Sequence, residues 1–155
     1  MRILLLAVGK AKPGPARALF EDYAQRLRPP IELIEVEERR RLGAGELKRR
    51  EAELLRAALA KRSGKPLSVA LDEHGQTMDT ATFARQLTRW RDGGAGEVAF
   101  LIGGADGLDG ELLRGSDLTL ALGPMTWPHM MVRALIAEQI YRAQQIAAGH
   151  PYHRV

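Results

Sequence analysis

Hydrophobic positions along the chain follow two periods, one typical of strands and one typical of helices. Residues 2–8 and 97–102 are short, unbroken apolar runs, as in strands that are buried on both faces of a sheet. Residues 46–61 instead repeat leucine and alanine at helical spacing, which predicts an amphipathic helix. Applied to the whole chain, the same rules predict strands over residues 2–8, 31–36, 67–71, 97–102 and 118–122 and helices over residues 15–27, 46–61, 80–90 and 130–148.

Strands and helices therefore alternate along the whole chain. This order is typical of an α/β fold built on a mostly parallel sheet. The 155 residues contain no internal repeat and no linker, so we predict a single domain over residues 1–155. Ligands in such folds bind beyond the carboxyl ends of the strands. We therefore expect the functional site in three segments that follow predicted strands, at residues 72–75, 103–107 and 123–129.

Composition excludes several classes of protein. The chain contains no cysteine, which excludes a disulfide framework, a cysteine-ligated zinc and a cysteine nucleophile. Its apolar runs fall far short of the ~20 residues that span a membrane, and the apolar stretch at the start is short for a secretion signal. We therefore expect a cytoplasmic protein with no membrane partner.

Charge is distributed unevenly along the chain. Residues 1–65 hold 16 Lys and Arg against 9 Asp and Glu, a net charge of +7, whereas residues 66–155 hold 7 against 10, a net charge of −3. A basic half favours a polyanionic partner, most simply nucleic acid, although solvated basic helices explain the charge alone equally well. Aromatic residues make up only 5% of the chain, which argues against a sheet that stacks bases.

Two glycines, Gly103 and Gly104, follow directly on the predicted strand 97–102. Glycine there allows a positive φ and lets a ligand approach the backbone closely. A tight turn into a short helix explains the pair as well. The spacing G-G-x-x-G is not that of a dinucleotide-binding loop, and no P-loop sequence occurs, so the sequence disfavours dinucleotide binding and nucleoside triphosphate hydrolysis.

A second candidate is the segment LGPMTWPH at residues 122–129, which contains two prolines. Proline restricts the residue before it, so we expect extended backbone at Gly123 and Trp127. A stiff segment of this kind leaves N–H and C=O groups free to bind a flat heterocycle such as adenine. The alternative is a rigid connection into the last helix, with Trp127 in the core.

Basic side chains of the C-terminal region form a third candidate. Arg133 follows His129 by four residues, so both share a helix face near the proline-containing segment, where a phosphate or a developing anion can sit. Arg142 follows Glu138 by the same spacing, which favours a structural ion pair. The tail HPYHR at residues 150–154 has an H-x-x-H spacing without an acidic neighbour, which is weak evidence for zinc, and we predict no metal.

Three segments carry a resemblance to a known family: LIGGADGL at residues 101–108, MTWPHMMVRALIAEQIYRA at 125–143 and HPYHR at 150–154. In this order they closely resemble the ribosomal RNA large subunit methyltransferase H family, a group of SPOUT-class enzymes. The segments LLAVGK, ELIEV and VALDEHGQ also resemble that family, so the resemblance covers essentially the whole chain.

The resemblance implies a methyltransferase that uses S-adenosylmethionine as its methyl donor and methylates N3 of a pseudouridine in 23S ribosomal RNA, within the ribosome or its large subunit. It also implies a homodimer and an α/β fold of SPOUT type whose C-terminal part forms a trefoil knot. Knots are rare exceptions among folds, and no periodicity predicts one. Two alternatives stay open: a non-catalytic RNA-binding or ribosome-assembly module, and a SPOUT enzyme that acts on transfer RNA.

The family's motifs also assign roles to positions of this sequence. Donor binding is implied for residues at three predicted strand ends: Leu71, Gly103, Gly104, Leu122, Gly123, Pro124, Met125, Thr126 and Trp127. The substrate side is matched by His129 and Arg133, and catalytic roles are implied for Arg142, Tyr152, His153 and Arg154. We favour His153 as the proton acceptor or orienting group, with Arg154 or Arg142 as its charge partner. Methyl transfer from a sulfonium to a ring nitrogen needs no metal.

Overall fold

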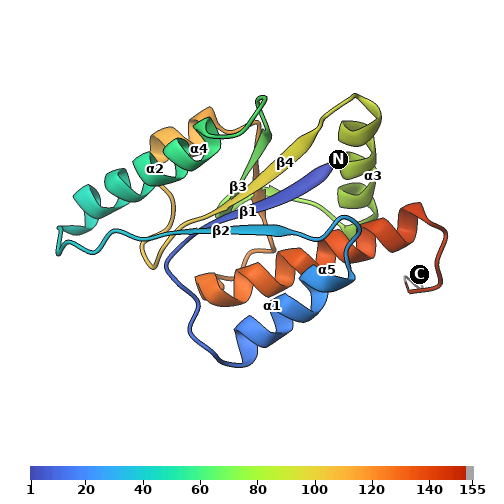
Figure 1. Cartoon of the computed structure of the whole chain (residues 1–155), viewed down its shortest axis with the longest axis horizontal. Coiled ribbons are helices and arrows are strands. Elements are labelled where there is room, and N and C mark those ends of the chain that lie inside the picture. Colours follow the sequence, from blue (N-terminus) through green and yellow to red (C-terminus); the bar gives the residue numbers. More distant parts are fainter. Residues whose placement is uncertain (153–155) are drawn as a thin grey trace.

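Five parallel strands form the centre of the molecule, in the order β2-β1-β4-β3-β5 (Figure 1). The computed structural model describes residues 1–152. Its strands are β1 (Arg2–Val8), β2 (Glu32–Val36), β3 (Leu67–Thr77), β4 (Glu97–Ile102) and β5 (Leu118–Ala121), and its helices are α1 (Pro15–Arg26), α2 (Ala44–Ala60), α3 (Thr80–Asp92), α4 (Gly110–Gly115) and α5 (His129–Ala147). The α/β fold with a parallel sheet is confirmed, and each predicted strand and helix is present.

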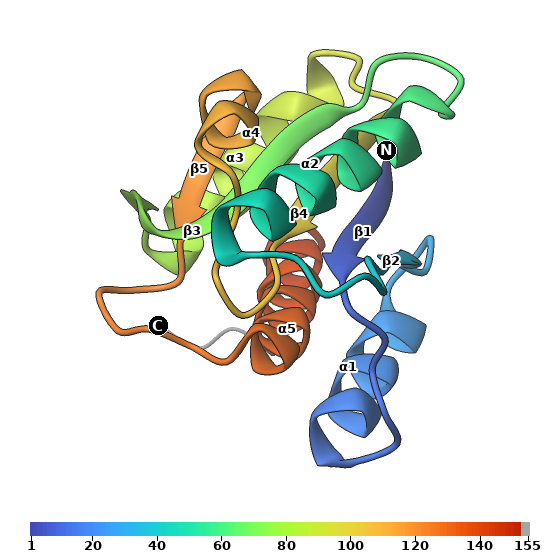
Figure 2. The same cartoon turned by 90° about the vertical axis from the view of Figure 1, so that its left-hand side faces the viewer.

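Helices cover both faces of the sheet. Figures 1 and 2 show α1, α3 and α5 on one face and α2 and α4 on the other. Alternate residues of β1 show this division, because Leu5 packs with the first group of helices and Leu4 and Leu6 pack with the second. A strand that is buried on both faces needs apolar residues at every position, which explains the unbroken apolar run at residues 2–8.

β3 is longer than its hydrophobic pattern predicts. It continues from Leu71 through polar residues to Thr77, and its pairing with β5 shifts register between Leu71 and Gln76. Gly75 lies in this part, where a Cβ atom would come within 2.8 Å of the backbone of Leu120. The close approach of β5 therefore requires glycine at position 75. Apolar alternation predicts a strand end at residue 71 because the sequence DEHGQT that follows is polar throughout.

Short connections carry the chain between the sheet and its helices. A short helix, α4, does follow the Gly103-Gly104 pair, and the side chain of Asp109 caps it by accepting a hydrogen bond from the backbone N–H of Glu111 at 2.9 Å. Asp79 caps α3 in the same way, through the N–H of Thr82. None of the helices within residues 1–152 is long and apolar enough to cross a membrane.

A cluster of ion pairs fixes the amino end of β4. Glu97, its first residue, is 7% exposed and pairs with Arg62 at 2.8 Å and with Arg2 at 2.6 Å. Hydrogen bonding to Arg62 lowers the pKa of Glu97. A carboxyl group with a lowered pKa in the folded state contributes stability at neutral pH, and this contribution is lost as the pH falls through that pKa.

We expect Glu97→Gln to lower the free energy of unfolding at neutral pH by about 1–3 kcal/mol, because Arg2 and Arg62 both lose a buried charged partner, although Arg62 keeps Glu32. The difference in stability between the variant and wild type should narrow below about pH 4. There Glu97 becomes protonated, first in the unfolded chain and at lower pH in the folded protein, so wild type also loses the charge. Urea unfolding at neutral and acidic pH measures both effects. Glu53→Gln, which removes one of the two carboxylate partners of Arg50 in an exposed ion pair, is the control and should change stability little. Equal losses in the two variants would contradict this role of Glu97.

Candidate functional site

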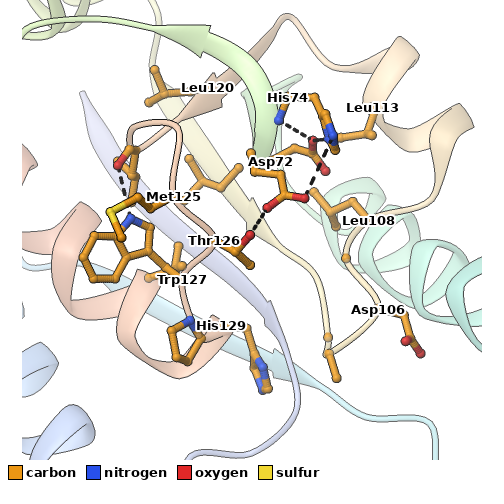
Figure 3. A pocket seen from close by; sticks show the side chains of 18 of the residues that line it. Asp72, His74, Asp106, Leu108, Leu113, Leu120, Met125, Thr126, Trp127 and His129 are labelled. Carbon is orange, nitrogen blue, oxygen red and sulfur yellow. Dashed lines mark hydrogen bonds and ion pairs between the residues drawn. The ribbon is translucent and has the colours of Figure 1, made fainter.

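The middle of β3 and the carboxyl ends of β4 and β5 meet around a cavity of about 830 Å³ (Figure 3). We call it the donor cavity, after the role that the family resemblance implies. All three segments singled out in the sequence contribute to its wall. Most residues implied in donor binding lie in this wall: Leu71, Gly104, Leu122, Gly123, Met125, Thr126 and Trp127. Gly103 and Pro124 are not part of the wall.

Gly103 shapes the loop after β4 through close packing of the backbone. A Cβ atom at this position would lie 2.5 Å from the carbonyl carbon of Gly107 and 2.8 Å from the backbone nitrogen of Leu108. The loop therefore folds back on itself so tightly that only glycine fits. The positive φ that the sequence allows at Gly103 occurs instead at Gly107, where φ is 78°. Gly104 is the member of the pair that lines the donor cavity.

A buried carboxylate lies directly behind Gly104. Glu51, on α2, is 9% exposed, and a Cβ atom at position 104 would lie 3.0 Å from its Oε1. Burial raises the pKa of Glu51, and the charge of Asp106 raises it further. A side chain at position 104 would push against this carboxylate, so glycine allows the loop backbone itself to form the cavity wall.

Residues 122–128 form another wall of the donor cavity. Thr126 donates a hydrogen bond to Glu73 in β3, and Trp127 Nε1 donates to the carbonyl oxygen of Leu122 at 3.3 Å (Figure 3). Gly123 has a φ of 103°, so the extended backbone expected there is wrong. Glycine adopts this conformation readily because it has no Cβ atom. Trp127 is 38% exposed, so the alternative that placed it in the core is also wrong.

Acidic groups outnumber basic ones in the wall of the donor cavity. Asp72, Glu73 and Asp106 contribute carboxylates, and Lys48 from α2 contributes the one ammonium group among the described residues of the wall. The backbone N–H of His74 donates to Asp72 at 2.9 Å and holds that carboxylate in place. Asp72 and Glu73 fall in a segment that the sequence singled out. Lys48 lies outside those segments, on a helix in which the sequence shows no motif.

His129 begins α5 and lines the donor cavity, whereas Arg133, one turn later, is only 2% exposed. Arg133 donates to the carbonyl oxygens of Val8 at 3.0 Å and Gly9 at 2.7 Å, and also to Glu35. These bonds tie α5 to β1 and β2. Burial and the positive charge of Arg133 lower the pKa of His129 and so favour its neutral imidazole. Contact of either residue with a substrate stays a prediction.

The other candidates that the structure describes lie towards the end of α5, outside the wall of the donor cavity. Arg142 Nε donates to Glu138 at 2.9 Å, which confirms the predicted ion pair. The guanidinium carbon of Arg142 lies 4.8 Å from the ring centre of Tyr152, whose hydroxyl lies 3.5 Å from that of Tyr23. Hydrogen bonding to Tyr23 and burial raise the pKa of Tyr152, so its phenol is neutral.

His153 and Arg154 lie outside the described residues. The catalytic roles expected for them, and for Arg142 and Tyr152, therefore stay predictions. Within residues 1–152, no three His, Asp or Glu side chains are grouped in a way that could hold a metal ion.

The sequence matches one protein family over nearly its whole length. The family described as predicted SPOUT methyltransferase matches residues 1–153. The protein named ribosomal RNA large subunit methyltransferase H from Rhodospirillum centenum is 59% identical over 154 residues, which cover 99% of each chain. Its namesake from Paramagnetospirillum magneticum is 55% identical with the same coverage. The chain therefore belongs to the SPOUT methyltransferases, and among them to the ribosomal RNA large subunit methyltransferase H family.

Two solved structures share the fold at low sequence identity. A structure described as a probable methyltransferase from Bordetella pertussis has a TM-score of 0.56 and 17% identity, and the match covers 92% of this chain and 95% of that one. A probable methylase family protein from Haemophilus influenzae has a TM-score of 0.58 and 13% identity, with 99% and 70% covered. These likenesses concern the fold alone.

We expect Gly103→Ala to destabilise the protein by about 1–3 kcal/mol, because the added methyl group would collide with backbone atoms of Gly107 rather than with a movable side chain. Gly115→Ala is the matched control, because a Cβ atom there meets nothing within 4 Å, and it should be neutral or slightly stabilising. Thermal denaturation of both variants measures the difference. A Gly103→Ala protein as stable as wild type would refute the steric role of this glycine.

Proposed function

We propose that this protein transfers a methyl group from S-adenosylmethionine to N3 of a pseudouridine in 23S ribosomal RNA, within the ribosome or its large subunit, in the cytoplasm. The observation that carries the proposal is the donor cavity beside the middle of β3 and the carboxyl ends of β4 and β5, in a chain that belongs to a methyltransferase family. The name of the close relatives supports large-subunit ribosomal RNA as the substrate class. The excess of basic residues in the first 65 positions suits such a polyanion.

S-adenosylmethionine fits the donor cavity in size and charge. The cavity volume of about 830 Å³ lies within the range of roughly 300–1,000 Å³ that is usual for small-molecule sites. Leu71, Leu122 and Trp127 offer apolar contacts to a purine ring, and the loop backbones offer hydrogen bonds to its edge. The carboxylates of the wall would balance the positive charges of a sulfonium and an amino group. When bound there, the donor supplies a methyl group on a positively charged sulfur.

The protein itself has to align the reactants and allow one proton to leave the acceptor nitrogen. Alignment can lower the barrier by several kcal/mol through proximity alone. The acceptor nitrogen must lose its proton, either to a side chain or to solvent, and the family resemblance favours His153 as the acceptor. Arg142 or Arg154 would stabilise the negative charge that develops on the ring oxygens. Glu138 and Tyr152 hold the Arg142 guanidinium in a fixed position for this task.

The proposal includes a homodimer with a knotted C-terminal part, as the family resemblance implies. Large apolar side chains at the surface support the dimer, since Leu19 is 49% exposed, Met131 42% and Trp127 38%. Leu19 and Trp127 line a further cavity of about 640 Å³ together with Arg142. A second copy that covered this apolar surface would bury it and would bring Arg142 into the interface.

Calorimetry and methyl-transfer assays test the proposal together. We expect the protein to bind S-adenosylmethionine and its demethylated product, and to transfer labelled methyl groups from the former to large-subunit RNA. Nucleoside mass spectrometry should find the label on N3 of one pseudouridine. Parallel assays with ribosomes, isolated large subunits and free ribosomal RNA identify the form of the substrate.

RNA binding without donor binding would identify a non-catalytic module, and labelled transfer RNA would identify a transfer RNA enzyme. Either result would overturn the proposal.

A protein that ends at Tyr152 should fold, remain dimeric in light scattering and bind the donor normally, because the described contacts of Tyr152 are retained. Methyl transfer should fall at least ~100-fold, since the shortened chain lacks a group for proton transfer and one for anion stabilisation. His153→Ala should show a smaller loss of the same kind. Full activity of the shortened protein would refute the catalytic assignment, and a lower melting temperature would assign the tail a structural role instead.

A further inference from the structure

A second cavity, of about 460 Å³, lies beside the donor cavity, between the β1–α1 connection and the start of α5. Its wall includes Lys10 and Lys12 from the connection and Arg133 from α5. We call it the β1–α1 cavity. His129 belongs to the walls of both cavities, so the two meet at this side chain.

The two cavities carry opposite charges. In the β1–α1 cavity, Arg17 and Arg133 each pair with a glutamate of the same wall. Lys10 and Lys12 have no acidic partner within residues 1–152, so this wall keeps an excess of two positive charges. In the donor cavity, three carboxylates face Lys48 as the basic group of the wall. A cation is therefore favoured on one side of His129 and an anion on the other.

Unused hydrogen-bond donors add to the positive potential of the β1–α1 cavity. Gly14 and Pro15 lie in its wall at the amino end of α1, and no side chain caps that end. The amino end of a helix carries free N–H groups and a partial positive charge. The Nε–H of Arg133 is also buried without an acceptor among the described residues. Together with the two lysines, these groups select an anionic ligand.

The rest of the β1–α1 cavity is largely apolar. Phe20, Leu33 and Met130 contribute side chains to its wall. Inorganic phosphate would contact only the lysines and would leave this apolar surface exposed to water. A nucleotide uses both parts, because its base packs on apolar and aromatic side chains while its phosphate meets the lysines.

We propose that the β1–α1 cavity binds the RNA nucleotide to be methylated, with its phosphate on Lys10 and Lys12, its ring on Leu33 and Met130, and its N3 edge towards His129. The proposal rests on the function proposed above, because it places the acceptor of that reaction. His129 would then stand between a cationic donor and an anionic acceptor. Its imidazole can donate an N–H to a ring carbonyl next to N3 and so orient the ring, which leaves N3 itself free to face the donor cavity.

The double variant Lys10→Ala/Lys12→Ala tests the phosphate contact. The concentration of ribosomal substrate that half-saturates this variant should be about tenfold higher or more than for wild type. Its affinity for S-adenosylmethionine should stay unchanged. The slope of log affinity for the RNA against log salt concentration should become shallower by about 1–2, as expected for two lost phosphate contacts. Lys61→Ala/Lys65→Ala is the matched control, because it removes the same charge before the amino end of β3, whereas Lys10 and Lys12 follow the carboxyl end of β1. The control should behave like wild type.

A second pair of variants tests occupancy of the apolar part. Ala16 lines the cavity, so Ala16→Phe should fill it and weaken RNA methylation by a similar factor while donor binding persists. Ala18→Phe adds the same side chain at an exposed position of α1 and should have no effect. Melting temperatures of all four variants verify that each is folded.

The outcomes separate this inference from the function on which it rests. If wild type methylates ribosomal RNA and the lysine variant resembles its control in both rate and salt dependence, the β1–α1 cavity is not the acceptor site. Loss of donor binding in the lysine variant would also overturn the inference, since it would place the lysines in the donor site. If wild type binds the donor but methylates no ribosomal RNA, the proposed function fails first, and the inference fails with it.

Discussion

The buried guanidinium of Arg133 is the contact on which the arrangement of the site depends. It joins the carbonyl oxygens at the end of β1 to Glu35 in β2, and it does so from the first turns of α5. Burial raises the pKa of Glu35, but hydrogen bonds from the N–H of Ala11 and from Arg133 lower it overall, so the pair stays charged. Breaking such a pair leaves an uncompensated charge in the interior, which is strongly destabilising. The same contact fixes His129 at the border of the two cavities.

Around this contact, the site is built from closely packed backbone. Gly75 allows β5 to approach the polar half of β3 closely, and Gly103 allows the loop after β4 to fold against Gly107. Neither position has room for a Cβ atom, so steric contact fixes the three strand ends relative to one another. Glu51 then closes the space behind Gly104. The result is a cavity wall with a fixed backbone, which can recognise a flat ligand by shape and by N–H and C=O groups without reorganising side chains.

Local patterns predict the strands, the helices and the three strand-end segments, because each of these features depends on residues that are close in sequence. Contacts between distant residues are not predictable in this way. Arg133 meets a partner 98 residues away, and Thr126 meets one 53 residues away. Glu35 is simply a polar position of an alternating strand, and Lys48 a charged position of an amphipathic helix. The second half of β3 is missed for the same reason, since its partner β5 holds it in the sheet while its own sequence is polar.

The charge of the donor cavity also bears on turnover under the proposed function. Loss of the methyl group converts a positively charged sulfonium into a neutral thioether. Asp72, Glu73 and Asp106 attract the charged form. The wall therefore favours the donor over its demethylated product.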